Sequence, residues 1–311
     1  TKFVILENVR NLADKTENWD VIKSELMKRD FYITEEPIII SPSNFALPQI
    51  RERVYILCIK KSIRNENILV NGYIHISDIG LENIHGKNKC KLGTAWKILE
   101  KSDVSDEYII TAEQELMISA WDELRIATGI KVIGFPLWIH CFGVGIDDTD
   151  KLKEKLFYDK MPKWKQNFVN NNRKFYLNNR AFIDEWIKKY DMLNRIKLYQ
   201  KFEWNCGEDC TDIHETIIQI RQSGIRVKRP NYYPSLVAIV NTPIIWDKRK
   251  GHYRTIIPRE AANLQNFDKR FKFIGTDNQA YQQLGNAINV RVVKILAAKL
   301  FGLAVEGWDQ V

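Results

Sequence analysis

A carboxylate follows the apolar run near the start of the sequence. Phe3–Leu6 is apolar and partly β-branched, and Glu7, Asn8 and Val9 come directly after it. Open α/β sheets place ligand-binding groups at the carboxyl ends of their strands. Glu7 could therefore donate a proton to a bound molecule. A glutamate that only forms structural hydrogen bonds at a strand end is the alternative.

Two arginines stand two residues apart in the stretch Asn44–Ile56. Side chains with this spacing point the same way along an extended chain. Arg51 and Arg53 could therefore clamp an anion or the carbonyl oxygen of a base. Two surface arginines paired with Glu52 are the competing interpretation.

The stretch Ile220–Pro230 is basic and has the pattern of an extended chain. Arg226 and Lys228 alternate along it, Arg229 follows, and hydroxyl-bearing residues lie just beyond. This pattern suits a segment that tracks a phosphate backbone. A solvated basic strand at a sheet edge, where charge guards against aggregation, would have the same sequence.

A glycine marks the last of the four stretches, which comprises Arg259–Phe267 and Gln283–Val290. Gly285 would let the backbone approach a ligand closely, in a Gly-Asn turn just before a helix begins. Such helix entries are common, and this stretch alone would not identify a site.

A sheet must bring these residues together. Phe3–Val9 has the continuous apolar character of a parallel strand buried on both faces. The spacing of Trp19, Ile22 and Leu26 predicts a helix after it. Two further strands are predicted on either side of the turn-rich segment Ser41–Pro48, over Tyr32–Ile40 and Val54–Lys60.

Helices are predicted further along the chain. Thr111 and Gln114 have the spacing of a capping box, and the helix they begin would end at Gly129. Between Lys151 and Tyr190 basic residues alternate with aromatic ones, and we interpret the aromatic stripe as core rather than as a platform for bases. Short and amphipathic helices are expected over Arg259–Phe267 and from Val290 to Leu300.

The composition limits the class of protein. The 311 residues carry 47 Lys and Arg against 39 Asp and Glu, a formal charge of +8, which favours a polyanionic partner without requiring one. No apolar stretch is long enough for a membrane helix, and there is no signal-peptide pattern, so we expect a cytosolic protein without a membrane partner. Five cysteines in no dense framework are expected to be free thiols.

Taken together, the four stretches resemble the motifs of the DNA cytosine-5 methyltransferase family. Glu7-Asn8-Val9 matches the family's ENV motif, and Gln49–Arg53 matches QxRxR. Arg259–Phe267 looks like RExxxLQxF, and Gln283–Ile288 looks like QxGNxV with isoleucine in the last place. Other stretches resemble the target-recognition regions of bacterial members, namely Trp121–Gly143, Lys201–Trp204 and Arg221–Leu236.

The resemblance implies a role for each matching residue. Glu7 would protonate a cytosine flipped out of duplex DNA, and Arg53, helped by Arg51, would hold its O2 oxygen. The methionine end of S-adenosylmethionine would lie against Gly285, Asn286 and Ala287. Contacts with double-stranded DNA would come from Asn8, Gln49, Arg226, Lys228 and Arg229. The implied function is sequence-specific DNA methylation, associated with restriction-modification.

One part of the family pattern is missing. The catalytic cysteine of the family follows a proline, whereas the five cysteines here follow Leu57, Lys89, His140, Asn205 and Asp209. The glycine-rich cofactor loop is missing as well. We therefore expect the chain alone to be inactive and a second polypeptide to carry both features. A truncated or cleaved chain would have the same sequence.

The fold expected from this resemblance is α/β. Residues 1–62 would form the C-terminal part of a Rossmann-like, S-adenosylmethionine-dependent methyltransferase sheet. Residues 63–250 would form a mixed α+β target-recognition domain, and residues 251–311 would return to the catalytic domain.

Two other functions fit the same fold. A non-catalytic DNA-recognition or regulatory subunit is the main alternative, although it would not need Glu7, Arg51 and Arg53. A tRNA-directed relative would have a much smaller recognition region.

No metal is expected. Cys206, Cys210 and His214 are four residues apart and could gather on one helical face around zinc. Gly207 disfavours that helix, and the spacing is not Cys-x-x-Cys, so we interpret these residues as part of a loop.

Overall fold

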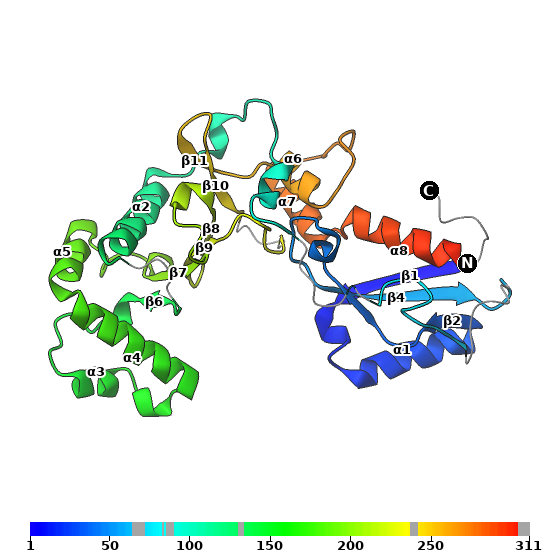
Figure 1. Ribbon diagram of the computed structural model, residues 1–311, viewed down its shortest axis with the longest axis horizontal. Coiled ribbons are helices and arrows are strands. Elements are labelled where there is room, and N and C mark those ends of the chain that lie inside the picture. The colour runs from blue at the N-terminus through cyan, green and yellow to red at the C-terminus, as the bar shows by residue number, and fades with distance from the viewer. Residues whose placement is uncertain (64–71, 83, 85–89, 130–133, 237–241, 304–311) are drawn as a thin grey trace. The chain divides into compact units, whose positions relative to one another are not determined.

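The computed structural model describes residues 1–63, 72–82, 84, 90–129, 134–236 and 242–303 (Figure 1). The contacts divide the chain into two compact units. The first unit comprises Thr1–Glu100, Asn231–Val240 and Pro258–Val311, and the second comprises Lys101–Pro230 and Asn241–Ile257. These boundaries differ from the predicted ones at 62 and 250.

The shift of the first boundary has a physical reason. Ile74, Ile79 and Leu81 lie beyond residue 62, yet they are buried in the same apolar cluster as Leu57 of the first unit. The chain therefore leaves this core only near Glu100.

A five-stranded mixed sheet forms the centre of the first unit. Strand β4 pairs antiparallel with β1, β2 and β3, and β2 pairs parallel with β5. The strands are β1 (Phe3–Val9), β2 (Phe31–Thr34), β3 (Ile38–Ile40), β4 (Arg53–Lys60) and β5 (Tyr73–Ile74).

Two strand predictions were wrong. Within the described residues β1 pairs only with β4, in antiparallel orientation, and Val9 is 51% exposed, so it is not a parallel strand buried on both faces. The continuous segment Tyr32–Ile40 is two strands, because Pro37 has no N–H to donate and lies between β2 and β3. The strand predicted over Val54–Lys60 is confirmed as β4.

Helices cover both faces of this sheet (Figure 1). Alternate residues of β4 pack in opposite directions: Leu57 contacts the cluster of α8 (Val290–Gly302), and Cys58 contacts the cluster of α1 (Thr16–Lys28). The rings of Phe3 and Phe301 lie 4.8 Å apart and fix the start of β1 beside the end of α8. Glu7 therefore lies further along β1, in the direction of the beginning of α8.

Two short helices precede α8, namely α6 (Pro258–Leu264) and α7 (Asp277–Asn286). Helix α6 confirms the helix predicted near Arg259. The predicted turn at Gly285 and Asn286 was wrong, since both residues are the last of α7 and Ala287 ends that helix. The missed signal is the capping box in which Thr276 and Gln279 bond to each other's backbone.

The second unit is built on a six-stranded mixed sheet. Its strands, in order across the sheet, are β11 (His252–Thr255), β10 (Ile244–Asp247), β8 (Ile217–Arg221), β9 (Gly224–Lys228), β7 (Lys201–Asn205) and β6 (Leu137–Trp138). The basic strand β9 lies between β8 and β7, so the interpretation as an edge strand was wrong.

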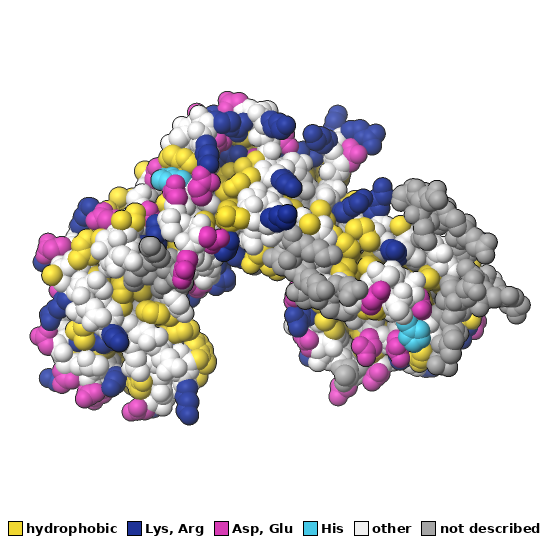
Figure 2. All heavy atoms as spheres, in the orientation of Figure 1, with side chains coloured by type: hydrophobic (Ala, Val, Ile, Leu, Met, Phe, Trp, Pro, Cys, Tyr) yellow, Lys and Arg dark blue, Asp and Glu magenta, His cyan; other side chains and the backbone are white. Residues whose placement is uncertain are grey.

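Four helices of the second unit are α2 (Ala112–Ala127), α3 (Thr149–Lys155), α4 (Lys163–Asn178) and α5 (Arg180–Tyr190). Helix α2 confirms the prediction, with both hydrogen bonds of the Thr111 capping box present. The aromatic stripe of α5 is confirmed as core, since Trp186 and Tyr190 are buried. Figure 2 shows basic and acidic side chains interspersed over the visible face of these helices.

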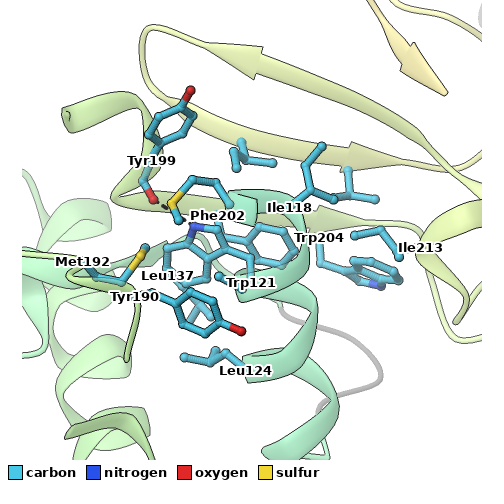
Figure 3. Packing of buried hydrophobic residues seen from close by; sticks show 14 of the residues in the cluster. Ile118, Trp121, Leu124, Leu137, Tyr190, Met192, Tyr199, Phe202, Trp204 and Ile213 are labelled. Atoms are coloured by element: carbon cyan, nitrogen blue, oxygen red, sulfur yellow. Dashed lines mark hydrogen bonds between the residues drawn. The ribbon is translucent and has the colours of Figure 1, made fainter. Parts of the chain in front are cut away.

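Trp121 of α2 lies at the centre of the second core (Figure 3). Its ring stacks on Phe202 of β7 at 5.2 Å, and its indole nitrogen donates a hydrogen bond to the carbonyl oxygen of Tyr199 at 2.8 Å. Trp186 donates in the same way to Ala120. Truncation of such a tryptophan costs about 3–5 kcal/mol, so this packing fixes helix α2 against the sheet.

Among the described residues, no helix has the length and apolar character needed to cross a membrane.

Candidate active site and basic sheet face

Glu7 and Arg53 form an ion pair on the face of the first sheet that α8 covers. In the antiparallel register Glu7 lies opposite Tyr55, which makes Arg53 its diagonal neighbour. The Arg53 Nε atom is 3.1 Å from Glu7 Oε1, and the two side chains are 18% and 19% exposed. The pair is therefore sheltered but open to a ligand.

The alternative pairing of these arginines with Glu52 was wrong. Glu52 pairs with Arg10 at 2.6 Å, on the exposed side of the strand. Arg53 donates to the backbone carbonyl oxygen of Glu52, while its ion pair is with Glu7. Neighbouring side chains of an extended chain point in opposite directions, so the Glu52–Arg10 pair lies on the surface and the Arg53–Glu7 pair is sheltered.

Arg51 lies two residues before Arg53 and is 5% exposed. One terminal nitrogen of its guanidinium donates to Ser235 Oγ and Leu236 O, both at 2.9 Å. The other donates to Gly285 O at 2.8 Å and Ala287 O at 3.1 Å. Burial, with a contribution from the nearby Arg53 charge, lowers the pKa of Arg51 to about 10, and the group stays cationic at neutral pH.

The charges of these three side chains do not cancel. Arg51 and Arg53 together carry two positive charges against the single negative charge of Glu7, which leaves a net positive charge at the site. Such a site favours a ligand on which negative charge develops, and it does so more strongly where water is partly excluded.

The segment Gly285–Ala287 is brought to the same place through the two carbonyl groups that bind Arg51. The end of α7 carries partial negative charge and suits an ammonium group. Asn286 is exposed there and offers an amide oxygen and an amide nitrogen. These residues fit the amino-acid end of S-adenosylmethionine.

Asn8 and Gln49 are not part of this cluster. Asn8 is exposed and lies opposite Val54, on the sheet face away from Glu7, and its side chain accepts a hydrogen bond from Val9. Gln49 is fully buried, and its amide group has no hydrogen-bond partner among the residues that the structure describes. A direct contact of Gln49 with DNA would require its side chain to become exposed.

The outward face of the second sheet gathers basic side chains. Glu203 of β7 binds two of them: Lys201 Nζ lies 2.6 Å from Oε1, and Arg226 Nε of β9 lies 2.5 Å from Oε2. Burial alone would raise the pKa of the Glu203 carboxyl, but the hydrogen bonds from Arg226 and Lys201 outweigh it and hold the pKa below its ordinary value.

Lys228 adds to the positive charge of this face. Burial lowers its pKa, and so do the neighbouring charges of Arg226 and Arg221. Arg229 follows β9 and pairs with Asp209 at 2.6 Å. The sequence analysis missed that Glu203 binds both Lys201 and Arg226, although Lys201 and Glu203, two residues apart, would lie on one face of a strand.

Cys206, Cys210 and His214 do not form a helical face. Cys206 and Cys210 are buried in the second core, and His214 packs against Trp246 and Tyr253. Among the described residues, no group of three or more His, Cys, Asp or Glu side chains could hold a metal ion.

Comparisons with known proteins identify the family. The model of the C-5 cytosine-specific DNA methylase family matches residues 1–302. The Type II methyltransferase M.AluI of Cellulosimicrobium cellulans is 27% identical over 94% of this chain and 69% of its own length. M.BanI of Aneurinibacillus aneurinilyticus is 26% identical over 96% of this chain and 71% of its own length.

A solved structure also aligns with the chain. The Dnmt2 methyltransferase of S. pombe is 14% identical with a TM-score of 0.47, and the alignment covers 96% of this chain and 66% of that one. Because the family model spans almost all of the sequence, the conclusion rests on that match. The chain belongs to the C-5 cytosine-specific DNA methylase family.

Proposed function

We propose that this chain carries the base-binding and DNA-recognition parts of a DNA cytosine-5 methyltransferase. The reaction would transfer a methyl group from S-adenosylmethionine to C5 of a cytosine in a specific duplex sequence. The names of M.AluI and M.BanI as Type II methyltransferases support a restriction-modification role. The observation that carries the proposal is the sheltered Glu7–Arg53 ion pair.

Glu7 acts on the nitrogen side of the base. The C5 carbon of cytosine is a poor nucleophile until a thiolate adds at C6, and that addition puts negative charge on the ring. Glu7 would stabilise this charge by accepting a hydrogen bond from the exocyclic amine and, once it has taken up a proton from the solvent, by donating that proton to N3. The partial exposure of the carboxylate allows a flipped base to reach it.

Arg53 and Arg51 contribute positive charge. Arg53 would donate to O2 of the cytosine and stabilise the electron-rich ring, which is the kind of donor placement that lowers a barrier most. Arg51 helps through its charge, because both of its terminal nitrogens are bound to protein groups.

S-adenosylmethionine supplies the electrophilic methyl group when it is bound. Gly285, Asn286 and Ala287 would hold its methionine end at the end of α7. Their attachment to Arg51 places these residues beside the strand that bears Arg53.

The basic sheet face would hold the DNA backbone. Arg226, Lys228 and Arg229 are assigned to phosphate contacts, which favour binding to any duplex and lose affinity as salt rises. We also propose DNA contacts from Asn8, which is exposed, and from Gln49. The contact from Gln49 requires its buried side chain to become exposed.

The attacking thiolate comes from outside these 311 residues. None of the five cysteines follows a proline, and Cys58 illustrates their state: burial raises the pKa of its thiol to about 12, which makes it unreactive. We propose that the Pro-Cys segment and the cofactor loop lie on a second polypeptide or on further residues of the same protein.

A labelled methyl-transfer assay tests the proposal. The chain is mixed with duplex DNA and radiolabelled S-adenosylmethionine, with and without a polypeptide that carries the Pro-Cys segment, and the product nucleosides are identified by mass spectrometry. We expect 5-methylcytosine only in the complete mixture. DNA binding without any product in the complete mixture would favour a non-catalytic recognition subunit, and methylated tRNA would favour a tRNA-directed enzyme.

A further inference from the structure

Arg51 joins three segments that are far apart in the sequence. Its own segment, just before β4, meets Ser235–Leu236 and Gly285–Ala287 through hydrogen bonds of the Arg51 side chain. Its own backbone is fixed as well, because its amide donates to Ser41 Oγ at 3.0 Å. Gln49, two residues before Arg51, forms an isolated β-bridge with Tyr233.

The guanidinium group has no terminal hydrogen left for a base. It carries four terminal N–H groups, and four acceptors bind its two terminal nitrogens. The remaining donor, Nε, is buried. Arg51 therefore cannot contact the O2 oxygen of a flipped cytosine without giving up one of these bonds.

We propose that Arg51 is a positioning residue that sets the cofactor-binding segment against the base-binding pair. By binding the carbonyl groups of Gly285 and Ala287, it fixes the end of α7 relative to Arg53, which lies two residues further along the chain and begins β4. This inference rests on the proposed function of the Gly285–Ala287 segment. It replaces a direct contact of Arg51 with the base by a role exerted through the backbone.

A lysine cannot take over this role. Its single ammonium group can donate three hydrogen bonds from one point, whereas the planar guanidinium spans acceptors on two sides. Arg51→Lys therefore keeps the charge and loses the bridge. The end of α7 would then move relative to Arg53, and small displacements between reacting groups have large effects on catalysis.

The second unit offers a matched control. Arg173 is 3% exposed, and its terminal nitrogens donate to the carbonyl groups of Phe142, Gly143, Ile146 and Asp147. Arg173→Lys disrupts an equivalent set of bonds far along the sequence from Gly285. Both variants should lower the melting temperature.

Two measurements on the complete methyltransferase separate the variants. Hydrogen exchange reports the protection of the backbone amides from Gln283 to Val290 without cofactor, and calorimetry reports the dissociation constant of S-adenosylhomocysteine. In Arg51→Lys we expect exchange at least tenfold faster and binding at least fivefold weaker. Arg173→Lys should change neither. Ser235→Ala removes only one acceptor and should give a two- to threefold change in the same direction.

The outcomes distinguish this inference from the function on which it rests. The positioning role would be overturned if hydrogen exchange and cofactor binding in Arg51→Lys matched those in Arg173→Lys. A fall in kcat with unchanged binding would also overturn it, because it would mean that Arg51 touches the base. If Arg51→Lys does not fold, an unchanged exchange rate in Ser235→Ala would overturn it. A wild-type enzyme that binds no S-adenosylhomocysteine would instead count against the proposed function.

Discussion

At the residue scale, the two candidate sites use the same arrangement. A sheltered carboxylate binds a basic side chain from a neighbouring strand: Glu7 binds Arg53, and Glu203 binds Arg226. In both cases basic groups outnumber the carboxylate, because Arg51 lies beside the first pair and Lys201 binds the second carboxylate. The carboxylate orients an arginine, while the excess positive charge remains to attract an anion.

Glu203 makes stability depend on pH. Its pKa in the folded protein is lowered, so its contribution is fully present above the pKa of an unfolded glutamate, about 4.3, and is lost as the pH falls through the folded value. Glu203→Gln should lower the free energy of unfolding at pH 7 by about 1–3 kcal/mol.

Urea unfolding of the wild type and Glu203→Gln, at pH 7 and below pH 4, measures this contribution. The difference in free energy of unfolding between the wild type and Glu203→Gln should be smaller at the lower pH. Glu185→Gln, in an exposed pair on α5, is the control and should show no such change. An equal difference at both pH values would contradict the assigned charge of Glu203.

At the element scale, the register of β1 and β4 creates the Glu7–Arg53 ion pair, because it makes the two residues diagonal neighbours on one face. The turn between β8 and β9 plays the corresponding part in the second sheet. Gly224 has a φ of +126°, and a Cβ atom there would lie 2.4 Å from the carbonyl oxygen of Lys201. Only glycine allows this close approach of β9 to β7.

Gly224→Ala should therefore destabilise the protein by about 1–3 kcal/mol and weaken DNA binding, because it displaces Arg226 from Glu203. Gly145→Ala is the matched control, since Gly145 also has a positive φ, +74°, but has nothing within 4 Å of an added Cβ. Unfolding and binding measurements compare the two. If Gly224→Ala and Gly145→Ala changed DNA binding equally, the close approach of β9 to β7 would not matter for the basic sheet face.

The sequence predicted where strands and helices lie better than it predicted which strands pair and which side chains contact one another. The apolar run of β1 identified a strand, but such a run does not distinguish a parallel from an antiparallel neighbour. The spacing of Arg51 and Arg53 placed them on one face, yet only the tertiary structure gives Arg51 its carbonyl acceptors near residues 235 and 285. The turn predicted at Gly285 and Asn286 is the end of α7, because glycine is common at helix ends as well as in turns and the capping box at Thr276 begins a helix that includes both residues.

At the scale of the whole molecule, the chain carries a net charge of +8, and Arg226 and Lys228 of strand β9 contribute positive charge to one face of the second sheet. Lys228→Ala should weaken binding to all duplex sequences alike and reduce the slope of log binding constant against log salt by about 1. Lys188→Ala on α5 is the control, because its exposed side chain pairs with Glu185. A salt slope unchanged by Lys228→Ala would rule out its phosphate contact.

The division of labour between the two units is the central claim. In the proposed function the first unit would hold the base and the cofactor, the second would hold the DNA, and the thiolate would come from outside these residues. The proposed methyl transfer depends most on Glu7. Without a proton at N3, the negative charge that thiolate addition puts on the ring is not stabilised.

The most direct measurement is single-turnover methyl transfer by the complete enzyme carrying Glu7→Gln, beside Glu52→Gln as the matched control, a glutamate that directly precedes Arg53 in the sequence. We predict that Glu7→Gln slows transfer by about 10²–10⁴-fold with little change in DNA binding. Glu52→Gln, whose carboxylate pairs with Arg10 on the exposed side, should be as fast as the wild type. Full-speed transfer by Glu7→Gln would contradict the account.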